Sequence, residues 1–223
     1  VLLKGLSDKG FVFYTNFNSK KGGELKENQK ASMCFHWKSI RRQVRVIGKV
    51  EEVTAKEADN PIDLFKKWFS KAEETEINDP NAVAIASSDK DNQPNVRMVL
   101  LKGLSDKGFV FYTNFNSKKG SELKINQKAS MCFHWKSLRR QVRILGKVEE
   151  VTSKEADDYY YTRPYKNRIG AWASSQSKLL DKRETFLEKI KKFEKQYPDQ
   201  NSVPRPPNWS GWRLIPKEIE FWL

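Results

Sequence analysis

Cysteine and histidine are scarce in this sequence, with two of each among 223 residues, and long apolar runs are missing altogether. No Cys-x-x-Cys pair is present, so neither a redox-active pair nor a protein-bound metal site is expected. Because a membrane-spanning helix needs about 20 consecutive apolar residues, the sequence predicts no membrane association. The first residues also lack the pattern of a secretory signal, which favours the cytoplasm.

Signatures of two common enzyme classes are absent as well. The sequence has no Gly-x-Gly-x-x-Gly motif and no alternation of strands with helices, which disfavours a Rossmann fold. No histidine accompanies a serine in a recognisable nucleophile elbow, so no nucleophilic triad is expected. The residues alone therefore name no catalytic side chain.

The most informative feature present is a duplication. Residues 1–59 (copy one) recur as residues 99–157 (copy two) with only six differences. Three of these exchange one aliphatic side chain for another, which conserves core volume. Two near-identical segments suit the same place in a fold, so we interpret residues 60–223 as the domain and residues 1–59 as an incomplete barrel segment. We expect copy one to compete for the strand positions of copy two, within or between chains.

The net charge of +14 suggests nucleic-acid binding, but the duplication accounts for most of it. Copy one holds 12 basic and 7 acidic residues, copy two holds 12 and 6, and the remaining sequence adds only three positive charges. A chain with a single copy would be mildly basic, as many enzymes with phosphorylated ligands are. A nucleic-acid partner is therefore not expected.

Apolar periodicity and turn residues predict a series of short strands with a few helices. Strands are predicted over residues 82–87, 96–102, 108–114, 129–135, 141–152, 209–216 and 218–222, and helices over 61–74, 117–126, 153–161 and 181–197. We expect the strands 96–102 and 108–114 to form a hairpin. Asp181 and Glu184 predict a capping box at the start of the last helix. This pattern favours a mainly β fold, an antiparallel barrel of Greek-key type with helices around it.

Three clusters of cations and hydroxyl groups could hold a phosphate. One is the strand 97–102, which has a cation at each end, and another is the segment 112–119, where hydroxyl groups and two lysines meet at a helix start that favours anions. The third is Arg163, whose planar fork suits phosphate, followed by residues 176–177. Each cluster alone is a weak signal, because lysines beside a helix start usually form a solvated face and a tyrosine-rich helix usually packs against a core. The residues alone therefore predict only a phosphate-bearing ligand.

Seven motifs in series give the chain a more specific resemblance. They are Arg97-Met-Val-Leu-Leu-Lys102, Phe111-Tyr-Thr-Asn114, Arg140-Gln-Val-Arg143, Arg163-Pro164, Ile169-Gly-Ala-Trp172, Gln176-Ser177 and Ile219-Glu-Phe-Trp222. Their order is that of the pyridoxamine 5'-phosphate oxidases, and the chain resembles this family over residues 61–222, with copy one as a duplicate.

The resemblance implies an FMN-binding split β-barrel that works as a homodimer, with two FMN sites at the subunit interface. It implies oxidation of pyridoxamine or pyridoxine 5'-phosphate at the 4' carbon to pyridoxal 5'-phosphate, with O2 as acceptor and the redox step on FMN. The residues that would contact FMN are Arg97, Met98, Val99, Leu100, Leu101, Lys102, Tyr112, Thr113, Lys118, Lys119, Gln141, Gln176, Ser177 and Trp222. Those that would hold the substrate phosphate are Lys102, Tyr159, Arg163 and Asn167.

The sequence departs from the family pattern in several places. Lys118 stands where the family often has arginine, and Asn167 stands where it usually has serine. The family continues beyond Ile-Glu-Phe-Trp with an Arg-x-His-Asp-Arg motif that is not in this sequence, so we expect weaker substrate orientation. Copy one lacks a counterpart of Arg97, which assigns the working site to copy two. Two alternatives stay open: a flavin- or pyridoxal-phosphate-binding protein without turnover, and a basic nucleic-acid-binding protein.

Overall fold

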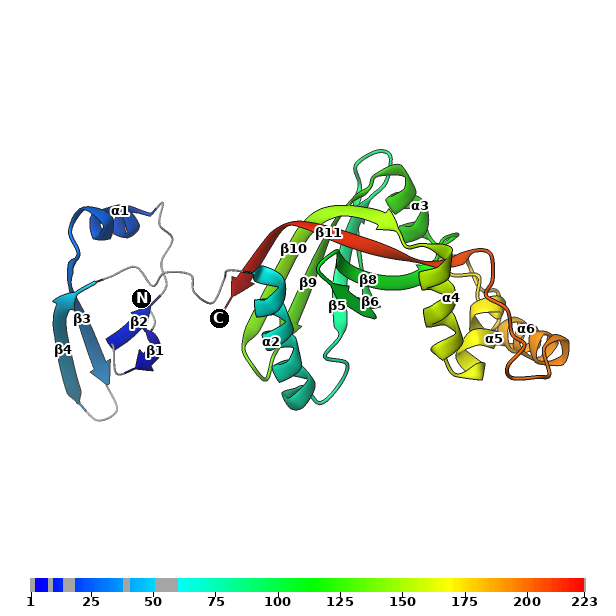
Figure 1. The fold of residues 1–223 in the computed structure, drawn as a ribbon, viewed down its shortest axis with the longest axis horizontal. Coiled ribbons are helices and arrows are strands. Elements are labelled where there is room, and N and C mark those ends of the chain that lie inside the picture. Colours follow the sequence, from blue (N-terminus) through cyan, green and yellow to red (C-terminus); the bar gives the residue numbers. More distant parts are fainter. Residues whose placement is uncertain (1–2, 8–9, 14–18, 38–40, 51–59, 223) are drawn as a thin grey trace. The chain divides into compact units, whose positions relative to one another are not determined.

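The computed structural model describes residues 3–7, 10–13, 19–37, 41–50 and 60–222, which belong to two compact units, Val1–Asp59 and Asn60–Leu223. The second unit contains a seven-stranded antiparallel sheet with helices on one face and at one end (Figure 1). In the described part of the chain, no helix is both long enough and apolar enough to cross a membrane.

The sheet of the second unit has the strand order β6-β5-β9-β10-β11-β8-β7. Its strands are β5 (Ala82–Ser88), β6 (Pro94–Leu100), β7 (Gly103–Ser105), β8 (Gly108–Asn114), β9 (Lys128–Trp135), β10 (Arg140–Glu150) and β11 (Trp209–Trp222). Only Leu101 and Lys102 separate β6 at one edge from β7 at the other, so the sheet has to curl until its edges approach. The predicted mainly β, antiparallel split barrel is confirmed.

The helices of this unit are α2 (Pro61–Thr75), α3 (Lys118–Ile125), α4 (Ser153–Thr162), α5 (Tyr165–Ala173) and α6 (Arg183–Gln196). Asn60 caps α2 as predicted, because its side chain accepts a hydrogen bond from the N–H of Ile62 at 2.9 Å. The apolar face of α2 covers the sheet, and Phe65 lies among the rings of Phe109, Phe133 and Trp135, at centroid distances of 4.9, 5.0 and 5.7 Å. This aromatic cluster is the centre of the core.

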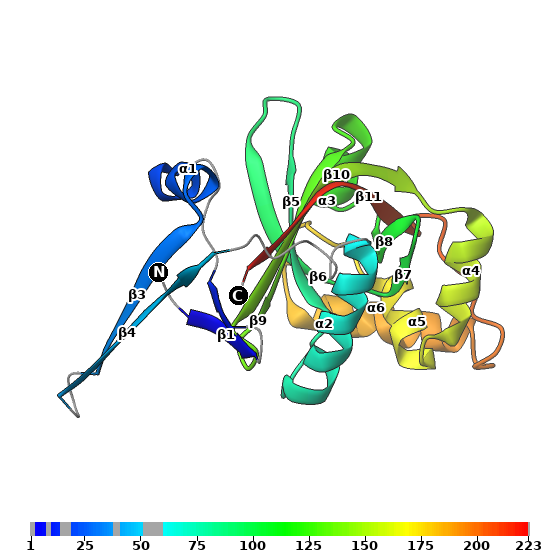
Figure 2. The ribbon, with the colours of Figure 1, turned by 60° about the vertical axis from the view of Figure 1, so that its left-hand side comes forward.

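Helices α4, α5 and α6 gather at the end of the sheet where β11 begins, and the last residues of β11 lie at the other end (Figure 1). A capping box of Thr152 and Glu155 starts α4. Helices α5 and α6 lie side by side (Figure 2), with the ring of Trp172 5.5 Å from that of Phe193. Residues of α4 and α5 line one side of the candidate site described below.

The strand predictions need two corrections. Strand β6 pairs with β5, and the hairpin partner of β8 is the short β7, because the chain passes between the sheet edges at residues 101–102. The two predicted final strands are one strand, β11. Pro216 does not end the pairing, because it lies opposite Gly146 at a register shift, where a bulge accommodates the missing N–H.

The helix predictions also need two corrections. Helix α6 begins at Arg183 with Lys182 in the N-cap position and no side-chain cap, so the capping box of Asp181 and Glu184 is wrong. Packing of its apolar stripe against α5 stabilises this helix instead. Pro164 ends α4 but also opens α5, which was not predicted; proline is tolerated at a helix start because that N–H needs no partner.

The first unit repeats the local structure of copy two. It contains β1 (Leu3–Ser7), β2 (Gly10–Phe13), α1 (Lys20–Glu27), β3 (Lys30–Trp37) and β4 (Arg42–Lys49), paired in the register of their repeat equivalents. Burial differs between the copies. Phe11 is 40% exposed and Val44 is 44% exposed, whereas their equivalents Phe109 and Val142 are fully buried. The described residues of the first unit include no counterparts of α2, β5 and β11.

This contrast predicts different costs for the same substitution in the two copies. Phe109→Ala should lower the free energy of unfolding by about 3–5 kcal/mol, because it opens a cavity against Phe65. Phe11→Ala, at an exposed position, should cost less than about 1 kcal/mol. Denaturant unfolding of both variants measures the difference, and equal losses would contradict it.

Candidate functional site

A cavity of about 470 Å³ opens in the second unit between β6, β8, α3, α4, α5 and the start of β11. It brings together most of the residues expected at the FMN and substrate sites. The predicted residues that line it are Met98, Val99, Leu100, Lys102, Tyr112, Thr113, Lys119, Tyr159, Arg163, Asn167 and Gln176. They come from segments up to 78 positions apart in the sequence, from Met98 to Gln176, so only the folded barrel forms the cavity.

Lys119, in the first turn of α3, supplies the best-buried cation of the cavity, with 6% of its surface exposed. Its ammonium group donates hydrogen bonds to the hydroxyl of Thr113, to the Ser117 hydroxyl at 3.3 Å and to Oε1 of Gln176 at 3.2 Å. Burial and, to a lesser extent, the positive charge of Arg97 lower the pKa of Lys119 to about 8, against the opposing effect of Glu122. A buried cation held only by neutral groups is suited to an anionic ligand.

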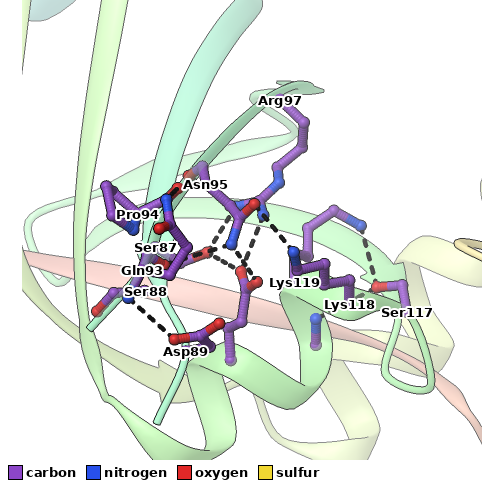
Figure 3. A network of polar contacts seen from close by, with 12 residues as sticks. Ser87, Ser88, Asp89, Gln93, Pro94, Asn95, Arg97, Ser117, Lys118 and Lys119 are labelled. Atoms are coloured by element: carbon purple, nitrogen blue, oxygen red, sulfur yellow. Dashed lines mark hydrogen bonds and ion pairs between the residues drawn. The ribbon is translucent and has the colours of Figure 1, made fainter. Parts of the chain in front are cut away.

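Arg97 and Lys118 lie beside Lys119 in a polar network (Figure 3). The guanidinium of Arg97 forms an ion pair with Glu122 at 2.8 Å, and the ammonium of Lys118 donates to Oδ1 of Asn95 at 3.1 Å. The N–H of Gly120 donates to the Ser117 side chain at 3.2 Å, which caps α3 as predicted. Three cations therefore converge near the N-terminus of α3, where the helix dipole also favours negative charge.

Arg163 supplies a separate cation beyond the C-terminus of α4. Its guanidinium lies over the ring of Trp209, 4.8 Å from the centroid, and its Nη1 is buried with no hydrogen-bond partner among the described residues. Burial lowers the pKa of Arg163. Because a buried, unpartnered guanidinium nitrogen is costly, it indicates a ligand with acceptor oxygens.

Stacked aromatic rings form one wall of the cavity. The ring of Tyr112 lies 4.1 Å from that of Tyr159 and 5.3 Å from that of Trp209, nearly parallel to both. The hydroxyl of Tyr112 donates to the backbone carbonyl of Glu155 at 3.2 Å, which ties β8 to α4. The wall therefore holds α4, and with it Tyr159, in place against the sheet.

Six predicted residues do not line this cavity: Arg97 and Lys118, described above, and four others. Leu101 is a core residue, and Ser177 is exposed beside Gln176 with φ of 63°. Gln141 and Trp222 face each other across β10 and β11 and line a second hollow of about 360 Å³. Trp209 and Trp222 end the same 14-residue strand, so about 40 Å of strand separates the two hollows.

Two residues with evident roles in the site were not predicted. Trp209 looked like the first residue of a strand, and nothing in its neighbours distinguishes it from a core tryptophan. Glu122 offered a signal, since it lies three positions after Lys119 on one helix face and could pair with cations there. Its actual partner, Arg97, is 25 positions away and becomes adjacent only in the sheet.

The donor set fits a flavin nucleotide: cations and a helix start suit its phosphate, and apolar strand residues 98–100 with stacked aromatic rings suit its ring system. Fold and site thus define a split β-barrel protein of the FMN-binding class. The family model "Pyridoxamine 5'-phosphate oxidase" matches residues 1–76 and 69–222. The chain belongs to the pyridoxamine 5'-phosphate oxidase family.

Individual relatives agree with this assignment. The chain is 60% identical over 164 residues to the pyridoxine/pyridoxamine 5'-phosphate oxidase of Pelagibacter ubique, covering 74% of this chain and 79% of the relative. It is 55% identical over 166 residues to the enzyme of that name from Sinorhizobium fredii, covering 74% and 80%. Among solved structures, PhzG from Burkholderia lata, in complex with tetrahydrophenazine-1-carboxylic acid, has a TM-score of 0.69 at 30% identity, covering 77% of this chain and 85% of that chain.

Proposed function

We propose that this chain is an FMN-dependent oxidase that converts pyridoxamine or pyridoxine 5'-phosphate into pyridoxal 5'-phosphate with O2 as electron acceptor. The observation that carries the proposal is one cavity with two separate cationic ends, Lys119 on α3 and Arg163 after α4. Among the described residues, neither of these cations has a carboxylate partner. Two phosphorylated ligands, cofactor and substrate, would explain both ends.

The residues divide into two groups by role. At the α3 end, Lys119, Lys118 and Arg97 would bind the FMN phosphate, with Thr113 and Gln176 orienting Lys119. At the α4 end, Arg163, Lys102, Tyr159 and Asn167 would bind the substrate phosphate and orient the 4' carbon. FMN, when bound, would supply the redox chemistry, a two-electron oxidation of that carbon with O2 as the final acceptor; with the amine substrate, water would then release the nitrogen as ammonia. No side chain of this chain is assigned a proton transfer or a nucleophilic step.

The proposal includes a homodimer. Gln141 and Trp222 are remote from the cavity within one chain, and a second subunit could bring them to it. Strand β6 is a sheet edge with Val96, Met98 and Leu100 exposed, an apolar row beside the cavity that a partner would cover. Light scattering in solution should give twice the chain mass. The cytoplasmic location expected from the sequence stays a prediction.

The test of the proposed function is the visible spectrum of the purified, FMN-loaded chain, followed by its reaction with pyridoxamine 5'-phosphate in air. We expect a yellow protein that forms pyridoxal 5'-phosphate and hydrogen peroxide in equal amounts. Bound flavin without product would favour the alternative of a binding protein without turnover. A colourless protein that ignores added FMN would overturn the proposal.

FMN affinity should depend on pH through Lys119. With a pKa of about 8, this ammonium is charged at pH 7 and largely neutral at pH 9, whereas the FMN phosphate stays ionised throughout. The dissociation constant should therefore rise about tenfold between pH 7 and pH 9, because binding takes up a proton above pH 8. Fluorescence titration measures it, and riboflavin, which lacks the phosphate, should show no such change. The charged groups that affect this titration are Arg97 and Glu122, with Lys102, Arg163 and Lys166 also lining the cavity.

A further inference from the structure

Glu122 on α3 is an acidic side chain at the centre of the cationic cluster described above, and only 3% of its side chain is exposed. Its carboxylate accepts three hydrogen bonds: from the Ser87 hydroxyl at 2.6 Å, from Nδ2 of Asn95 at 2.8 Å and from Nη2 of Arg97 at 2.8 Å. The donors come from β5 and β6, so the carboxylate joins α3 to two strands.

These contacts fix the plane of the Arg97 guanidinium. Its Nη1 donates to the hydroxyl of Ser87 at 2.5 Å and to the carbonyl of Asn95 at 3.3 Å, while Nη2 donates to Glu122. A guanidinium has five N–H groups, so contacts among the described residues leave two of the five for a ligand. A fork that is already held loses less entropy when it binds phosphate.

The same carboxylate also orients Lys118, through Asn95. Because Nδ2 of Asn95 donates to Glu122, the amide turns its Oδ1 toward the ammonium of Lys118, at 3.1 Å. Nδ2 also donates to the backbone carbonyl of Gln93, but at the longer distance of 3.4 Å, so the carboxylate makes the shorter of the two contacts that select this orientation. One acidic side chain thus organises two of the three cations.

We propose that Glu122 is a positioning residue for the phosphate end of FMN, which holds Arg97 and Lys118 in place before the ligand binds. This inference rests on the proposed function. It also accounts for a carboxylate beside an anion site, which simple Coulomb repulsion would disfavour. Three cations and Glu122 leave a formal charge of two positive, which matches the charge of about −1.5 to −2 on a phosphate monoester at pH 7.

The test is Glu122→Gln, which keeps the shape of the side chain and removes its charge. We expect the dissociation constant of FMN to rise about tenfold, because Arg97 and Lys118 lose their orientation. The dissociation constant of riboflavin should stay within about twofold, because the effect is confined to the phosphate. Glu24→Gln, the substitution at the repeat equivalent in copy one, is the matched control and should leave both constants unchanged.

A double-mutant cycle separates positioning from general damage. In an Arg97→Met background, the main partner of the Glu122 carboxylate is gone. Apart from its effect through Lys118, Glu122→Gln should then weaken FMN binding less than about twofold. Asn95→Ala removes the amide that links Glu122 to Lys118 and keeps the ion pair of Glu122 with Arg97. It should weaken FMN binding by about threefold, and it tests the positioning role if Glu122→Gln fails to fold.

Each outcome decides a separate question. Unchanged or tighter FMN binding by Glu122→Gln, or an equal loss for FMN and riboflavin, would overturn the positioning role while leaving the proposed function intact. A wild-type chain that binds neither flavin would instead overturn the proposed function, and the role of Glu122 with it.

Discussion

Lys119→Met should weaken FMN binding by about a hundredfold and raise the melting temperature of the FMN-free protein. The loss of affinity follows from burial, because a charge-assisted hydrogen bond formed away from water contributes about 1.5–3 kcal/mol. A loss near 2.7 kcal/mol corresponds to a hundredfold change in the dissociation constant. Fluorescence titration with FMN and with riboflavin measures it, and only FMN should be affected.

The opposite effect on stability has the same cause. Lys119 is buried with hydroxyl and amide partners and, among the residues that the structure describes, no direct carboxylate contact; desolvation is the main reason that its pKa falls to about 8. Methionine fills a similar volume without a charge to desolvate, so the melting temperature should rise by a few degrees. A binding residue that costs stability when the ligand is absent is the expected compromise at such a site.

The duplication supplies a matched control for this substitution. Lys21 is the repeat equivalent of Lys119, in the same helix context of α1, but it is exposed. Lys21→Met should change neither FMN affinity nor the melting temperature. If Lys21→Met weakened FMN binding as Lys119→Met does, the assignment of the site to copy two would be wrong.

Local structure was the part of this protein that the sequence determined best. The two copies, nearly identical in sequence, form the same strands, the same short helix and the same serine cap, Ser19 in one and Ser117 in the other. Turn residues and caps act within a few positions, so they work alike in both contexts. The same holds for α2, whose Asn60-Pro61 start was read correctly from two residues.

Burial and pairing could not be obtained in this way, and the same copies show why. Val44 and Val142 lie in equivalent strands with equivalent neighbours, yet one is 44% exposed and the other fully buried. The difference comes from α2, β5 and β11, which are outside the repeated block. The hairpin error has the same origin: periodicity identified the strand at β6, but its partner depends on how the sheet curls.

In the candidate site, too, features that depend on local sequence were predicted and features that depend on distant partners were not. Cations in motifs, such as Lys119 and Arg163, were predicted because the resemblance names residue types at fixed spacings. Trp209 and Glu122 were missed because each acts through a partner distant in the sequence, Arg163 for the first and Arg97 for the second. Gln141 and Trp222 were predicted as FMN contacts, and only the proposed dimer would place them near the cavity.

Arg163→Met should raise the KM for pyridoxamine 5'-phosphate by about a hundredfold or more while FMN affinity stays within twofold. Arg163 combines a buried Nη1, which has no partner in the part of the chain that the structure describes, with a guanidinium that lies over the ring of Trp209. A substrate phosphate would satisfy the nitrogen, and the aromatic ring keeps the fork turned toward the cavity. Removing the fork therefore removes both the charge and the geometry of recognition.

Two comparisons make this prediction specific to Arg163. Arg163→Lys should recover little of the loss, since lysine keeps the charge but neither stacks on Trp209 nor binds phosphate with two parallel hydrogen bonds. Lys154→Met, at an exposed position of α4 where the lysine pairs with Asp158, removes one cation nearby and should leave KM unchanged. Steady-state kinetics with FMN-saturated enzyme, and the spectrum of bound pyridoxal 5'-phosphate, provide independent readings. Full recovery by lysine would show that charge alone holds the substrate, and it would remove the role that the Trp209 ring has in this argument.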